Sequence, residues 1–114
     1  MNKIKILGTE YVIKVKSESE DSRLKKAWGY CDFTTKEIVI NSDVNKKGED
    51  ICTNSVEWKN KVIRHEVIHA FLYESGLKEN SYDSYAWAEN EEMVDWFAIQ
   101  SPKIFEAYKT LGVI

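Results

Sequence analysis

The residues best suited to chemistry lie together in the sequence His65-Glu66-Val67-Ile68-His69. On an α-helix, residues four apart share one face, so both imidazoles can bind a single metal ion. Glu66 follows His65 by about 100° around such a helix, which lets its carboxylate reach a water molecule at the metal without being a ligand itself. This spacing is typical of metal-assisted hydrolysis, in which Zn²⁺ is the usual cofactor.

Two histidines leave a catalytic zinc site one protein ligand short, since three protein ligands plus water are the usual set. The chain has no third histidine, so a carboxylate, or a cysteine, must complete the site. Glu91 and Asp95 stand four residues apart, so one could bind the metal while the other orients a ligand histidine. Glu92 points about 100° away and is the alternative ligand, with Glu89 as a further option.

These residues must be positioned by helices. Apolar residues recur at helical spacing after Asn54 and Ser55, which are good N-cap residues, and Gly76 fits the position that ends the helix. A second helix is predicted over residues 86–100. Ser101-Pro102 predicts the start of a third helix, with proline at its first position, that runs through Tyr108.

The first third of the chain favours strands. Residues 1–7 and 11–16 alternate around Gly8-Thr9, and residues 28–33 and 37–41 flank a second bend, so two β-hairpins are expected. Strands followed by helices predict an α+β fold, with a small antiparallel sheet packed on a long helix and two further C-terminal helices. A chain of 114 residues with 43% hydrophobic residues predicts one domain over residues 1–114.

Composition restricts the partners. A net charge of -3 argues against a nucleic-acid partner. The sequence contains no apolar run of the roughly 18–20 residues that a membrane span needs, and residues 1–15 lack the apolar core of a signal peptide. We therefore expect a cytoplasmic protein that binds no membrane, in which Cys31 and Cys52 are free packing residues. The composition leaves the oligomeric state open.

The pattern His65-Glu66-x-x-His69 followed by Asn90-Glu91-x-x-x-Asp95 resembles the HExxH…NExxxD arrangement of gluzincin metallopeptidases. The wider segment, from Gly29 to Gln100, is similar to small zincin-like proteins of phages and mobile elements, of the ImmA/IrrE type. The motif pair is specific and covers some 30 residues, whereas the rest of the match is loose.

The resemblance implies a minimal zincin-like fold and a peptide or protein substrate. It implies that His65, His69 and Glu91 bind zinc, that Glu66 is the general base and that Asp95 supports a ligand histidine. It also implies that residues 36–41 form the edge strand beside the cleft. Larger relatives use one more histidine near the oxyanion. Here a tyrosine would have to replace it, and the candidates are Tyr82, Tyr85 and Tyr73.

Three other functions fit the same residues. The chain could be a zinc-binding regulatory or interaction module of a phage or mobile element, without general proteolytic activity. It could also be a zinc hydrolase that acts on substrates other than peptides. In a metal-free binding domain, the histidines would be structural and the acids would be solvated at a helix N-terminus.

Overall fold

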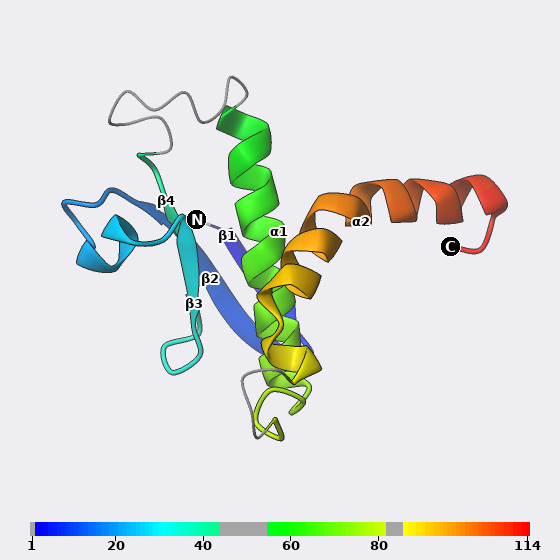
Figure 1. Ribbon diagram of the computed structural model, residues 1–114, viewed down its shortest axis with the longest axis horizontal. Helices are drawn as coiled ribbons and strands as arrows, with labels where there is room; N and C mark the ends of the chain where they lie inside the picture. The colour runs from blue at the N-terminus through cyan, green and yellow to red at the C-terminus, as the bar shows by residue number, and fades with distance from the viewer. Residues whose placement is uncertain (1, 44–54, 82–85) are drawn as a thin grey trace.

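The computed structural model describes residues 2–43, 55–81 and 86–114, and Figure 1 shows how their elements are arranged. These residues form strands first and long helices afterwards, so the predicted α+β class is confirmed. The strands are β1 (Asn2–Ile6), β2 (Thr9–Lys16), β3 (Gly29–Asp32) and β4 (Glu37–Asn41), the long helices are α1 (Ser55–Glu74) and α2 (Glu91–Leu111), and the short 3₁₀-helices are η1 (Ser22–Lys25) and η2 (Trp87–Glu89).

The four strands form one sheet in the order β1-β2-β4-β3. Both predicted hairpins are present, because β1 pairs antiparallel with β2 and β3 pairs antiparallel with β4. The two hairpins meet through β2 and β4, which run parallel, with Ile13 opposite Ile38 and Val15 opposite Ile40. The sheet is therefore mixed rather than purely antiparallel.

The position of β4 corrects the expectation that residues 36–41 form the edge strand. β4 lies between β2 and β3, and the free edge on this side of the sheet is β3. Ile38, Val39 and Ile40 are all buried, as expected for a central strand with both faces covered. The cleft beside the edge of the sheet is consequently bordered by β3.

Helix α1 packs across the sheet and carries the core. Val62 and Ala70 of α1 belong to a buried cluster with Ile38 and Ile40 of β4. At the last turn of α1, the Glu74 carboxylate accepts hydrogen bonds from sheet residues, including one of 2.6 Å from the Tyr11 hydroxyl. The buried face of α1 and the hydrogen bonds of Glu74 fix the orientation of α1 on the sheet. This orientation also sets the direction in which the histidine side chains point.

Helix α2 corrects the prediction of two C-terminal helices, because it continues through Pro102 without a break. Proline has no N–H to donate to the carbonyl four residues earlier, here that of Ala98. The Ala98 carbonyl instead accepts a hydrogen bond of 2.6 Å from Arg64 Nε of α1. Figure 1 shows α2 changing direction along its length, as expected for a proline inside a helix. Within the described residues, neither helix combines the length and hydrophobicity required to span a bilayer.

Candidate metal centre

His65 and His69 lie one turn apart on α1, and their side chains converge as the spacing predicts. Their Nε2 atoms are 3.2 Å apart, and both side chains are largely shielded from solvent. Two nitrogens that each lie 2.0–2.1 Å from a tetrahedral zinc ion are separated by about 3.3 Å. The pair therefore has the separation that a shared zinc ion requires.

Glu91 supplies a carboxylate from the first residue of α2. The Asn90 side chain caps this helix by accepting a hydrogen bond of 2.8 Å from the Met93 N–H, which fixes where the helix begins. The Glu91 oxygens lie 3.4 Å from His65 Nε2 and 2.5 Å from His69 Nε2. Across the described parts of the chain, His65, His69 and Glu91 form a group whose ligand atoms all lie within 4.8 Å of one another. Two imidazoles and a carboxylate are a donor set that suits zinc.

Asp95 lies one helical turn beyond Glu91 and faces the other ring nitrogen of His65, with its Oδ1 3.1 Å from Nδ1. An Nδ1–H that donates to this carboxylate leaves Nε2 unprotonated and available to a metal. Burial lowers the pKa of His65, but the hydrogen bonds to Glu91 and Asp95 and the nearby charge of Glu66 outweigh it and raise the pKa above 6.5. The pocket around His65 is thus electrostatically suited to a cation.

Glu66 points into the interior beside the two histidines. Its side chain is only 7% exposed, and it lines two pockets, one with Trp28 and Lys61 and the other with Tyr30 and Lys78. Burial raises the pKa of this carboxyl above its ordinary 4.5, although the histidines oppose the shift. A raised pKa next to a cation site is the property that a general base needs.

The other predicted site residues fall into two groups. Glu92 and Glu89 are not among the three grouped ligands, and Glu89 instead accepts hydrogen bonds of 3.0 Å from Lys78. Tyr73 stacks on Phe33, with ring centroids 4.4 Å apart. The remaining predicted residues lie outside the described part of the chain: Tyr82, Tyr85 and Cys52.

Cys31 lines the pocket on the His69 side of the centre, and it is a free thiol. Burial is the main cause that raises its pKa to about 12, and the charge of Glu66 adds to the effect. A thiol with this pKa stays protonated at neutral pH, and the thiolate is the form that binds metals. Among the described residues, the group of converging ligand atoms contains Glu91 and does not include Cys31.

Sequence reasoning missed Lys61, which lies one turn before His65 on the same face of α1. Its Nζ is 2.8 Å from Asp95 Oδ1, the atom that also faces His65. Lys61 lowers the pKa of Asp95 against the opposing effect of burial and so keeps that carboxylate ionised. The spacing of four residues between Lys61 and His65 is the signal that could have revealed it.

Gly29 at the start of β3 lines both pockets and brings the sheet edge close to α1. A Cβ atom at this position would lie 2.9 Å from the Val39 carbonyl oxygen and 2.9 Å from Val62 Cγ1. A larger residue would push the strand away from the helix. Only glycine lets the β3 backbone border the pockets at this distance.

Comparisons with protein-family models, with curated proteins and with solved structures find no match to this chain. The chemistry and geometry of the site are therefore what indicate a function for this chain.

Proposed function

We propose that this protein is a zinc-dependent metallopeptidase. The observation that carries the proposal is the convergence of His65, His69 and Glu91 from two helices, with the buried carboxyl of Glu66 beside them. The described residues fit zinc in donor type, and the spacing of the histidine nitrogens suits tetrahedral coordination. The resemblance of the two motifs to those of gluzincins supports the same function.

In this proposal His65, His69 and Glu91 would hold Zn²⁺, which when bound would polarise a substrate carbonyl and lower the pKa of water toward about 7. Glu66 accepts a proton from the attacking water and then donates it to the nitrogen of the leaving amine. Burial suits Glu66 to this exchange, because a raised pKa makes the carboxyl both an adequate base and an adequate acid. Asp95 orients His65 throughout the reaction.

The edge of β3 favours a peptide as the substrate. The Asn41 N–H donates to the Trp28 carbonyl at 2.8 Å, so in this antiparallel ladder Tyr30 faces β4 and the backbone groups of Gly29 and Cys31 face outward. An extended peptide could pair with these outward groups, as in strand addition to a sheet edge. Such pairing would draw a backbone carbonyl toward Glu66, which lines the same pockets.

The test compares zinc-loaded wild type with Glu66→Gln on a diverse peptide library, with mass spectrometry as the readout. We expect the wild type to cleave peptides. Glu66→Gln should retain stoichiometric zinc and lose at least about 100-fold in rate, the usual contribution of a general acid–base. The matched control is Glu57→Gln, which changes an exposed acid of the same helix and should keep full activity.

Two outcomes would contradict the proposal. If Glu66→Gln cleaved peptides as fast as the wild type, the assigned base would be wrong. If the zinc-loaded wild type cleaved no peptide or candidate protein substrate, the zinc-binding interaction module would become the better account. A cytoplasmic location, in which the Cys31 thiol would stay reduced, belongs to the same proposal.

A further inference from the structure

The last part of α2, residues 102–111, forms an arm whose apolar face packs on nothing in the described structure. The buried stripe of α2 runs through Val94, Ala98 and Ser101 and continues at the same helical spacing through Phe105 and Tyr108. Phe105 and Tyr108 are nevertheless 47% and 42% exposed. Figure 1 shows this end of the helix leading away from the sheet and from α1. We call residues 102–111 the arm.

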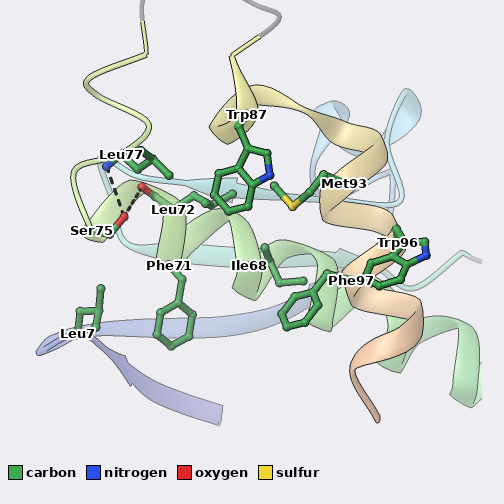
Figure 2. Close-up of a pocket in the computed structure, with 10 residues that line it drawn as sticks. All are labelled: Leu7, Ile68, Phe71, Leu72, Ser75, Leu77, Trp87, Met93, Trp96 and Phe97. Carbon is green, nitrogen blue, oxygen red and sulfur yellow. Dashed lines mark hydrogen bonds between the residues drawn. The ribbon is translucent and has the colours of Figure 1, made fainter. Parts of the chain in front are cut away.

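A second apolar surface lies between α1, the start of α2 and the β1–β2 turn. It is a groove of about 540 Å³, whose walls include Leu7, Phe71, Trp87 and Trp96. Figure 2 shows their side chains around a common hollow. Trp87 and Trp96 are 60% and 58% exposed. The groove shares no lining residue with the two pockets at the metal centre.

The arm cannot fill the groove of its own chain. Trp96 and Phe97 of the same helix form one wall of the groove, and the arm continues that helix for roughly 15 Å at 1.5 Å per residue. A continuous helix cannot fold back onto its own first half. The groove nevertheless suits such an occupant, because an apolar helix face laid into an apolar groove is a recurring mode of protein recognition.

The exposed areas of the two surfaces are large enough for a stable contact. With roughly 200 Å² for a whole aromatic side chain, the exposed fractions of Phe105 and Tyr108 amount to about 180 Å² on the arm. Those of Phe71, Trp87 and Trp96 amount to about 320 Å² on the groove. An exchange between two copies would contain this contact twice. The total would be on the order of 1,000 Å², which is the size that a specific biological interface should reach.

We propose that two copies of this chain form a two-fold symmetric dimer in which the arm of each copy lies in the groove of the other. In a symmetric pair each chain offers both surfaces, so the arm and the groove, which no described residue of the same chain covers, are both filled. Phe105 and Tyr108 would then occupy a buried environment like that of Val94 and Ala98 earlier on the same face.

Sedimentation equilibrium of the purified full chain tests this proposal. The wild type should show a mass near twice the 13.3 kDa of one chain. Phe105→Glu on the arm and Trp87→Glu in the groove should each weaken the dimer by at least about 100-fold, because each places a charge within both copies of the apolar contact. Val56→Glu, which adds the same charge at an exposed position at the start of α1, should leave the dimer intact.

Circular dichroism confirms that each variant is folded, and Leu7→Glu replaces Trp87→Glu if that variant is not. A monomeric wild type would overturn the proposal. A folded groove variant that stays dimeric would overturn it as well, since contact between two arms alone would then suffice. A folded arm variant that stays dimeric would also overturn the proposal, because the arm would then not be needed for dimerisation. The readout involves neither zinc nor peptide cleavage, so its failure is separate from failure of the proposed function.

Discussion

Asp95 Oδ1 lies 3.1 Å from His65 Nδ1, so an acid of α2 orients a histidine of α1 whose other ring nitrogen faces Glu91. The same oxygen accepts a hydrogen bond from Lys61 Nζ at 2.8 Å. Lys61 and Asp95 thus support His65 through consecutive hydrogen bonds. These contacts fix the ring orientation of His65 in the absence of metal, which lowers the entropic cost of ordering this ligand when a metal binds.

Replacing Asp95 with alanine should weaken zinc binding about 10- to 100-fold, the usual effect of removing a carboxylate that supports a ligand histidine. Competition with a chromophoric chelator at pH 7 measures the change in affinity. Glu92→Ala on the same helix is the matched control and should bind zinc as the wild type does. Equal affinity in Asp95→Ala and Glu92→Ala would show that Asp95 has no such role.

Glu66 should destabilise the metal-free protein at neutral pH. Its folded-state pKa is raised above 4.5, mainly by burial, so ionisation costs more in the folded than in the unfolded state. This free-energy cost reaches its full size above the folded-state pKa. It disappears as the pH falls below 4.5, because the carboxyl is then protonated in both the folded and the unfolded state. Glu66→Gln should therefore unfold at a higher denaturant concentration than the wild type at pH 7 when both are free of metal.

Urea unfolding at a series of pH values checks this sign. The advantage of Glu66→Gln should shrink steadily as the pH is lowered from 7 toward 4. Glu106→Gln on the exposed end of α2 removes a comparable charge and should show no such trend. A Glu66→Gln variant that is less stable than the wild type at pH 7 would mean that the carboxylate is stabilised inside the fold rather than strained.

Arg64 should matter to stability because Pro102 frees the Ala98 carbonyl that Arg64 binds. Arg64→Met leaves this carbonyl without its donor and should lower the free energy of unfolding by about 1–3 kcal/mol. In a Pro102→Ala background the backbone N–H of residue 102 can bind the carbonyl again. The cost of Arg64→Met should then be clearly smaller, and a double-mutant cycle by urea unfolding measures the difference.

Arg64 also pairs with the exposed Glu57 at 3.1 Å, so the control for this cycle is Glu57→Gln. Removing a surface ion pair should cost no more than about 1 kcal/mol, with or without Pro102. If Arg64→Met cost the same free energy in both backgrounds, the contact with the Ala98 carbonyl would not be compensating for the proline.

The sequence predicted the parts of the site that depend on local spacing. His65, Glu66 and His69 share one helix, and the helical period alone brings the two imidazoles together. Glu91 and Asp95 also share a helix, so their relation to each other followed from sequence. That Glu91 rather than Glu92 meets the histidines depends on how α2 is rotated against α1, and this rotation is set by tertiary packing.

Contacts between hairpins were beyond the sequence, since the parallel pairing of β2 with β4 joins separate hairpins. One available signal was misread. The run Ile38-Val39-Ile40 has no polar alternation, which favours a central strand over an edge. Pro102 was also misread as a helix start, because the donor that compensates for it, Arg64, comes from another helix.

The most direct test of the metal centre is the anomalous difference map of zinc-soaked crystals, recorded at the zinc absorption edge. The account predicts one strong peak per chain, about 2.0–2.1 Å from Nε2 of His65 and of His69 and at a similar distance from a Glu91 oxygen. A map without a peak between these three side chains, or with zinc held by other residues, would contradict the account.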